Sequence, residues 1–299
     1  MAQHQRTLNG KWIAIPFAFF ALLTLPIGFW VRANFGPPAI ERSEEAVELT
    51  TRVAALSPAV ALLMDQVGAG HMVVARHGYD RWSDQSLPAA GDQAGIDYEA
   101  LLAAEPTDVL LEWGSRDLPD RLVELGGERD WHVESYALST LDGIASTADA
   151  LHTRYVGSGT SPSNALEQSL QPVAGAEGVG RVLLLMSADP PQVRGPGAAH
   201  HQLLVRLGAT PVITEGSMWI ELDAEDVLRL APDAIVLISP GGIGDTEQAL
   251  GRLATLPIPA IQSGRVGVID RPTALLPTLA LGEVADDLAA LLREWSTSD

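Results

Sequence analysis

Two tryptophans stand next to segments with the pattern of regular structure, and their indoles could hold a flat ligand. Trp113 directly follows the apolar run 108–111, and Trp219 comes just before a helix expected from residue 223. A rigid aromatic side chain in such a loop can stack on a macrocycle while losing little conformational entropy. The alternative is ordinary packing beneath a loop. We predict that both indoles contact a ligand.

The segment 76–82 mixes polar and aromatic side chains directly after an expected strand. Loops at the carboxyl ends of strands carry the binding residues of open α/β folds. We therefore expect His77, Tyr79 and Trp82 to border a polar-rimmed pocket. The Tyr79 phenol could be a ligand to ferric iron, or only a hydrogen-bonding part of the pocket wall.

Two arginines in loops, Arg116 and Arg194, could bind an anionic group of a ligand. A guanidinium donates two parallel hydrogen bonds to a carboxylate or phosphate, which fixes its orientation as well as its position. The alternative for each is a solvated surface side chain. We place Arg194 among the predicted ligand-binding residues.

His200 and His201 are adjacent at the expected start of a helix. Neighbouring side chains on a helix point about 100° apart, so these two do not readily bind one ion from the same face. One of them could be an axial ligand to haem or cobalt, and the alternative is a histidine making polar contacts. The remaining histidines show no recognisable metal-ligand spacing. We predict no protein-held metal site.

Signatures of catalysis are sparse in the sequence. The chain has no cysteine, which removes thiolate metal sites and cysteine nucleophiles. The glycine patterns that cradle phosphate do not occur, nor does a GxSxG motif. Ser57 has no identifiable base partner. We predict a binding protein rather than an enzyme, without catalytic residues and without a resident cofactor.

The elements that would position these residues form an internal repeat. One fixed offset of 126 residues aligns 97–113 with 223–239, and brings Glu99 onto Glu225. Both copies have the pattern of a short helix, a turn containing proline and a buried strand. An acidic residue in the first turn of a helix favourably meets the helix dipole, so stabilisation of the helix is one reading of both glutamates.

The repeat extends upstream and predicts the fold class. Arg52 and Arg181 each open a strand-like run that leads into an amphipathic segment ending at glycine. Strands that alternate with helices indicate parallel sheets, with binding loops at the carboxyl ends of the strands. We predict an α/β protein with two Rossmann-like lobes, 50–138 and 179–299, joined by a helical interlobe connector at 139–178.

The N-terminal segment 1–38 predicts the location. From Trp12 to Val31 the chain is uncharged and almost wholly apolar, about the twenty residues that a transmembrane helix needs. We predict a retained membrane anchor, the alternative being a cleaved signal peptide. Either reading places the folded body on the extracytoplasmic, periplasmic side of the cytoplasmic membrane.

The net charge of the chain indicates which classes of molecule it can bind. The formal net charge is −19, and Lys11 is the only lysine. So acidic a protein repels phosphate backbones, which excludes nucleic acid as an expected partner. We expect a monomer that binds a small molecule.

In order and spacing, several segments resemble the helical-backbone family of extracytoplasmic binding proteins that serve ABC importers for cobalamin, haem and ferric siderophores. The resemblance covers roughly 50–295, and it is carried by the segments 52–58, 99–106, 140–144, 194–213, 219–237 and 263–270. It implies two α/β lobes bridged by helices, with the ligand bound between the lobes. It also implies that Glu99 and Glu225 dock onto arginines of an ABC permease.

Within that family, the cobalamin-binding members are the most similar. Their tryptophans flank a corrinoid at the positions of Trp113 and Trp219, and the Asp270 position also contacts ligand. The sequence departs from them at Gln93, which replaces a further tryptophan, and near Ala274, which replaces an arginine. We place both Gln93 and Asp270 among the predicted ligand-binding residues. We predict capture of a bulky ligand, with cobalamin or another corrinoid favoured over haem or a ferric siderophore, and delivery to a permease.

Two alternatives from other classes remain open at this stage. One is a membrane-tethered sensor or partner-binding module without a transporter, which the uncleaved anchor and the short connector suggest. The other is a metalloenzyme or hydrolase built on the same scaffold, using His200 or His201.

Overall fold

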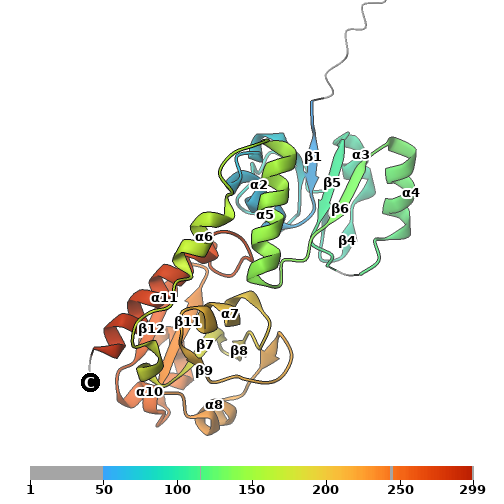
Figure 1. The fold of residues 1–299 in the computed structure, drawn as a ribbon. Coiled ribbons are helices and arrows are strands. Elements are labelled where there is room, and N and C mark those ends of the chain that lie inside the picture. Colours follow the sequence, from blue (N-terminus) through green and yellow to red (C-terminus); the bar gives the residue numbers. More distant parts are fainter. Residues whose placement is uncertain (1–49, 115, 243–244, 298–299) are drawn as a thin grey trace, which may run out of the picture. The chain divides into compact units, whose positions relative to one another are not determined.

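The computed structural model of the chain describes residues 50–114, 116–242 and 245–297. Strands and helices alternate along it and form two main sheets and a two-stranded hairpin (Figure 1). The expected α/β class is confirmed. The apolar stretch 12–31, expected to be a transmembrane helix, lies outside the described residues. Among the described helices, none combines the length and the apolar character that crossing a bilayer requires.

The first sheet is wholly parallel and has the order β2-β1-β5-β6. Its strands are β1 (Val53–Ala55), β2 (Val73–Arg76), β5 (Asp108–Leu111) and β6 (His132–Ser135). The elements between them are α2 (Pro58–Gln66), η1 (Gly70–Met72), the hairpin strands β3 (Gly91–Asp92) and β4 (Gly95–Ile96), α3 (Tyr98–Ala103) and α4 (Asp120–Arg129). We call 50–138 the N-terminal lobe.

The second sheet has the order β10-β8-β7-β11-β12, with β9 pairing β7. Its strands are β7 (Arg181–Ala188), β8 (Pro191–Val193), β9 (Thr210–Pro211), β10 (Ile220–Glu221), β11 (Ala234–Ser239) and β12 (Val266–Asp270). Its helices are η2 (Ala176–Val179), α7 (Ala199–Arg206), α8 (Ala224–Leu230), α9 (Thr246–Leu250), η3 (Gly251–Thr255), α10 (Pro259–Gln262) and α11 (Leu281–Ser296). We call 179–299 the C-terminal lobe.

One expectation about this second sheet was wrong, because it is not wholly parallel. β8 runs antiparallel to β7, and β10 antiparallel to β8. The turn at Asp189 and Pro190 sends the chain straight back along β7, so no helix separates the two strands. Such a tight return can join only antiparallel strands.

The repeated units have matching structures. Asp97 caps α3 by accepting from two backbone N–H groups of the first turn, and Asp223 caps α8 by accepting from one, that of Asp226. Each unit then passes through one residue in the left-handed region, Glu105 at φ 47° and Ala231 at φ 44°. The following prolines lead into β5 and β11, whose residues are all buried. The repeat in the sequence is therefore a repeat in the fold.

The arginines that open each lobe hold these units to the sheets. The Arg52 guanidinium donates to the Ala104 carbonyl at 2.7 Å, and the Arg181 guanidinium donates to the Leu230 carbonyl at 2.5 Å. Ala104 and Leu230 correspond under the same offset of 126 residues. Each arginine thus satisfies carbonyls at the end of a helix, which have no partner within the helix.

The connector consists of α5 (Leu141–Tyr155) and α6 (Ser163–Ser169). The Thr140 hydroxyl caps α5 by accepting from the Gly143 N–H at 3.0 Å. A side chain at Gly143 would meet the Ala137 carbonyl oxygen at 2.3 Å, which explains a glycine in the first turn of this helix. The Gln202 side-chain oxygen on α7 accepts from the Leu141 N–H at 2.8 Å, so the C-terminal lobe also caps the connector.

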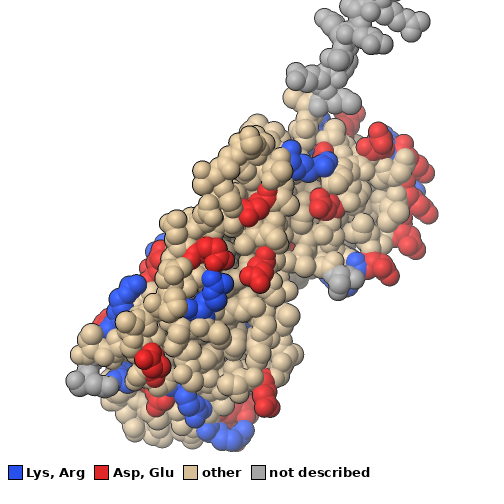
Figure 2. Space-filling model, in the orientation of Figure 1, with Lys and Arg blue, Asp and Glu red and all other residues tan. Residues whose placement is uncertain are grey.

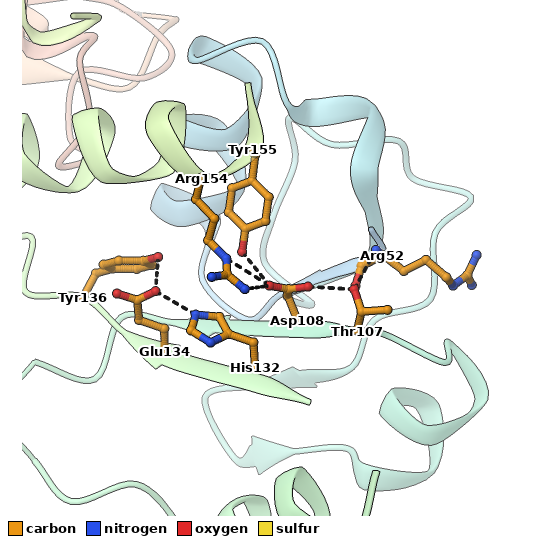
Figure 3. Close-up of polar contacts among 8 residues, drawn as sticks. All are labelled: Arg52, Thr107, Asp108, His132, Glu134, Tyr136, Arg154 and Tyr155. Carbon is orange, nitrogen blue, oxygen red and sulfur yellow. Dashed lines mark hydrogen bonds and ion pairs between the residues drawn. The ribbon is translucent and has the colours of Figure 1, made fainter. Parts of the chain in front are cut away.

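A polar network anchors the other end of α5 to the first sheet (Figure 3). Asp108, buried at the start of β5, accepts from the Arg154 guanidinium at 2.7 Å and from the Tyr155 hydroxyl at 3.0 Å. Thr107 donates to its other oxygen at 2.6 Å. Burial by itself would raise the pKa of Asp108, but these hydrogen bonds outweigh it and lower the pKa. On the neighbouring strand, Glu134 accepts from the Tyr136 hydroxyl at 2.9 Å.

One apolar cluster runs through both lobes and the connector. It includes Val53 and Leu63 from the N-terminal lobe, Leu151 from α5, and Val236 and Leu288 from the C-terminal lobe. Bending the lobes apart would expose part of this cluster to water, at about 25 cal/mol for each Å² of apolar surface. We therefore expect the range of any hinge motion to be small.

Candidate ligand-binding site

A hollow of about 410 Å³ opens at the carboxyl ends of β1, β2 and β5 in the N-terminal lobe. Its wall contains three of the predicted ligand-binding residues, His77, Gln93 and Trp113, and also Arg116. The remaining lining residues are Leu56, Ser57, Pro58, Ala90, Gly91, Asp92, Ala94, Gly95, Ile96, Leu111 and Glu112. The strand ends therefore bring together residues from three separate loops, as expected for an open α/β sheet.

A smaller hollow of about 140 Å³ adjoins it and is walled by both lobes. The N-terminal lobe contributes Glu112 and Leu138, and the C-terminal lobe contributes Arg194, His200 and Met218. Ser139, Ala198, Ala199, Leu275 and Pro277 complete the lining. Since Glu112 belongs to both walls, the two hollows meet at its side chain, and together they form the candidate site.

Ser57 fixes the orientation of Glu112. The Ser57 hydroxyl donates to the Glu112 carboxylate at 2.8 Å, and it accepts from the N–H groups of Ala59 and Val60 at the start of α2. The Glu112 side chain keeps solvent-accessible surface because it faces the hollows, yet the surrounding protein still raises its pKa by desolvation. Its second carboxylate oxygen accepts no hydrogen bond from the described residues.

Arg194 lies against the other tryptophan. Its guanidinium stacks on the Trp219 ring, 4.3 Å from the ring centre. Val193 of β8 pairs with Ile220 of β10, and continuing this antiparallel register by one residue places Arg194 opposite Trp219. No acceptor among the described residues hydrogen-bonds this half-buried guanidinium. Desolvation lowers the pKa of Arg194, while the charge of Glu112 opposes that shift.

The N-terminal lobe has a matching pair. The Arg116 guanidinium lies 4.3 Å from the centre of the Trp113 ring and donates to the Trp113 carbonyl at 3.2 Å. The Trp113 indole N–H donates to the Asp117 carbonyl at 3.0 Å, which holds the ring in place. A guanidinium thus covers one face of each predicted tryptophan. A stacking ligand would use the other face, displace the arginine, or stack on the guanidinium itself.

Of the 76–82 segment, His77 alone lies in the lining of the larger hollow. The Tyr79 ring is 54% exposed and lies 5.7 Å from the His77 ring. Desolvation lowers the pKa of His77 against the raising effects of Asp92 and Asp80, so the imidazole is neutral at neutral pH. Trp82 instead lines a separate hollow beside α2, together with Asp65 and His71.

Asp270 and Trp219 lie outside the lining of both hollows. Asp270, exposed at the end of β12, accepts from the Gly242 N–H at 3.1 Å. Trp219, 45% exposed, reaches the smaller hollow only through its contact with Arg194. Direct ligand contact therefore remains a prediction for both.

The two adjacent histidines of α7 point to different backbone carbonyls. The His200 Nε2 atom lies 2.8 Å from the Ala274 carbonyl oxygen, and the His201 Nε2 atom lies 2.9 Å from that of Ile213. A carbonyl only accepts, so each Nε2 carries the hydrogen. Burial lowers the pKa of His200 to about 4. Across the described residues, no three His, Asp or Glu side chains are grouped to hold a metal ion.

Glu99 and Glu225 occupy equivalent exposed positions. Each follows a capping aspartate in the first turn of its helix, α3 or α8, and each side chain is open to solvent. Acidic side chains gather along the outer edge of the N-terminal lobe, over α3 and α4 (Figure 2). This geometry suits either stabilisation of the helix or docking to a basic surface.

Sequence reasoning missed Glu112 and Met218. Glu112 stands at the carboxyl end of a buried strand, immediately before Trp113, and a charged residue at that position was a usable signal. Met218 gave no usable sequence signal, because an exposed methionine in a loop has many possible roles. Its 44% exposed side chain lines the smaller hollow and gives it an apolar, adaptable wall.

The charged side chains that line the two hollows carry balanced formal charges. They are two acids, Asp92 and Glu112, and two arginines, Arg116 and Arg194. The Ser57 hydroxyl already donates to Glu112 and accepts from the backbone, so it is not an activated nucleophile. The N-terminal lobe contributes Asp92, Glu112, Arg116 and the Trp113 ring to this site, and the C-terminal lobe contributes Arg194.

Comparison with solved structures identifies the fold. The chain is similar to the periplasmic vitamin B12-binding protein of Vibrio cholerae, with a TM-score of 0.63 and 18% identity over 83% of this chain and 98% of that one. It is also similar to a periplasmic haem-binding protein from Pseudomonas aeruginosa, with a TM-score of 0.62 and 22% identity over 83% and 93%.

A possible iron-binding periplasmic protein from Staphylococcus epidermidis shares the fold as well, with a TM-score of 0.61 and 14% identity over 81% of this chain and 98% of that one. No protein-family model matches the sequence. No curated protein matches it either. The likeness is therefore one of fold, and it agrees with the family resemblance found in the sequence.

Proposed function

We propose that this chain is an extracytoplasmic solute-binding protein that captures a bulky ligand between its two lobes and delivers it to an ABC permease. The observation that carries the proposal is the pair of adjoining hollows that share Glu112 and draw walls from both lobes. Similar solved proteins are named as binding proteins for vitamin B12, haem or iron. Their fold supports the same role here, and a role in binding rather than in catalysis.

The charges of the site favour a ligand with little net charge. The described lining contains two acids and two arginines, whose formal charges cancel, and the neutral His77 and His200 add no positive charge. A site built for a highly anionic ferric chelate would present an excess of cations. Among the three ligand classes considered, we therefore propose cobalamin or a related corrinoid first, and haem or a ferric siderophore as alternatives.

Calorimetry with cyanocobalamin, hemin and several ferric siderophores tests the binding role. We expect one ligand class to bind at one molecule per chain with a dissociation constant below about 10 μM, roughly −7 kcal/mol. Failure of every class to bind at that level would refute the proposed function. Binding of hemin alone would keep the function and correct the ligand.

We further propose that Glu99 and Glu225 orient the loaded protein on the permease, one acid from each lobe. Their matched, exposed positions support this role. Replacing both with arginine should abolish uptake in a transport assay while ligand affinity stays unchanged. A matched control replaces Glu124 and Glu128, which lie on α4, with arginine and should leave uptake normal. Normal uptake by the Glu99 and Glu225 variant would refute the docking role.

We also propose where the protein acts in the cell. Residues 12–31 would anchor the protein, or direct its export, and the body would act outside the cytoplasm as a monomer. Carbonate extraction of membranes distinguishes these readings, because a retained anchor keeps the protein in the membrane fraction and a cleaved signal releases it. Recovery of the protein from the cytoplasm would contradict both readings.

A further inference from the structure

The smaller hollow is a dipolar compartment. Its described lining holds one acid, Glu112, and one base, Arg194, contributed by opposite lobes. Their charges interact through space, since each shifts the pKa of the other, but they form no direct ion pair in the described part of the chain. Polar atoms of both side chains therefore remain available to a group that enters between them.

The size of this hollow restricts what can enter. About 140 Å³ is several times the roughly 30 Å³ that one water molecule occupies in the liquid. It is far smaller than the adjoining hollow of about 410 Å³. A ring system would have to occupy the larger hollow, so the smaller one suits a single polar substituent of the ligand.

We infer that the smaller hollow binds a primary carboxamide substituent of the ligand, held between Glu112 and Arg194. This inference rests on the proposed function and names the ligand chemistry of its site. A primary carboxamide offers one acceptor oxygen and two N–H donors on the nitrogen, and this oxygen and nitrogen are bonded to the same carbon. The oxygen accepts from the Arg194 guanidinium, and the amide nitrogen donates to the free carboxylate oxygen of Glu112.

Both side chains are held ready for this arrangement. Ser57 occupies one oxygen of Glu112, which leaves the other for the ligand. Trp219 supports one face of Arg194 and leaves its N–H groups without an acceptor among the described residues. Fixed side chains lose little conformational entropy when they bind, which strengthens each hydrogen bond they form.

A carboxylate fits the same hollow poorly. It could accept from Arg194, but it has no hydrogen to donate to Glu112, and the two negative charges would repel. His200 does not relieve this repulsion, because burial holds its pKa at about 4 and keeps the ring neutral. The hollow thus selects an amide over the acid of the same shape.

The test compares cyanocobalamin, which carries several primary carboxamides, with its derivatives in which one amide at a time is hydrolysed to the acid. Calorimetry on the wild-type protein should show a tenfold to hundredfold weaker affinity for at least one derivative, the range of about 1.5 to 3 kcal/mol for a hydrogen bond to a charged group. The other derivatives should bind nearly as well as cyanocobalamin.

Two variants assign the effect to the hollow. Glu112→Gln keeps the shape and can still accept from Ser57, but it can also donate to a carboxylate, so it should bind the discriminated acid derivative at least as well as cyanocobalamin. Arg194→Leu should weaken cyanocobalamin binding at least tenfold. Glu124→Gln and Arg121→Leu, which break an exposed ion pair on α4, are the matched controls and should change neither affinity.

Each outcome bears on a different claim. Equal binding of cyanocobalamin and all acid derivatives, or an unchanged preference in Glu112→Gln, would overturn the carboxamide site and leave the binding function intact. Binding of hemin or a siderophore without any corrinoid would do the same. Failure of all ligands would overturn the proposed function as well.

Discussion

The buried imidazole of His200 makes the stability of the protein depend on pH. Its side chain is only 4% exposed, and its Nε2 atom donates to the Ala274 carbonyl. Burial lowers the pKa from the ordinary 6.5 to about 4, and the nearby charge of Arg194 acts in the same direction. In the folded protein the ring therefore resists protonation, whereas in the unfolded chain it protonates near pH 6.5.

The sign and the size of the effect follow from this difference. Above about pH 6.5 the ring is neutral in both the folded and the unfolded state, so it does not change the free energy of unfolding. Between about pH 6.5 and about pH 4 the unfolded chain binds more protons than the folded protein. Stability is therefore lost as the pH falls through this window. From about pH 7 to about pH 4.5 the expected loss from His200 alone is about 2 to 3 kcal/mol.

Urea unfolding of the wild type and of His200→Gln, at about pH 7 and about pH 4.5, isolates this contribution. Glutamine can still donate to the Ala274 carbonyl but does not titrate, so the variant should lose about 2 to 3 kcal/mol less than the wild type across the same pH interval. The carboxylates contribute equally to the pH dependence of stability in both proteins, so their contributions cancel when the two losses are compared. An equal loss in both proteins would show that His200 is not buried in its neutral form.

Two further substitutions test the packing that positions the lobes. Gly143→Ala should lower the free energy of unfolding by about 1 to 3 kcal/mol in a urea titration, because its Cβ would meet the Ala137 carbonyl oxygen at 2.3 Å. Gly127→Ala, in open space on α4, should instead stabilise by about 1 kcal/mol, and a loss of similar size in both variants would contradict the argument. Arg154→Leu should lower the free energy of unfolding by about 2 kcal/mol. It should also raise the pKa of Asp108, which NMR titration measures. An unchanged pKa would show that the Arg154 contact does not stabilise the ionised carboxylate of Asp108.

Much of the fold was readable because it obeys local rules. The alignment of 97–113 with 223–239 predicted α3, β5, α8 and β11. A capping aspartate, a proline and a buried strand carry that information in neighbouring residues. The same alignment covered Glu99 and Glu225, whose equivalent positions the structure confirms.

The parts that could not be predicted depend on contacts between distant segments. The short strands β8 and β10 have two or three residues each, too few to show any periodicity. Yet their antiparallel register is what places Arg194 on Trp219. Likewise, Glu112 and Arg194 line the same hollow although they lie 82 residues apart in the sequence. No local sequence pattern at either residue predicts that they come together.

Trp82 shows that residues close together in the sequence can also be wrongly assigned to one site. The polar and aromatic residues of 76–82 were predicted to act together, but the chain turns within this segment. The buried Asp80 accepts from the N–H groups of Trp82 and Ser83, which directs the indole away from the larger hollow and toward α2. Loop residues that are adjacent in sequence therefore face two different surfaces.

The most direct test of the central claim is a crystal structure of the protein with the tightest-binding ligand from the calorimetric comparison. We predict one ligand per chain, with its ring in the hollow beside Trp113 and His77 and a polar substituent between Glu112 and Arg194. A ligand bound in the Trp82 hollow, or elsewhere on the surface with the space between Glu112 and Arg194 left to water, would contradict it.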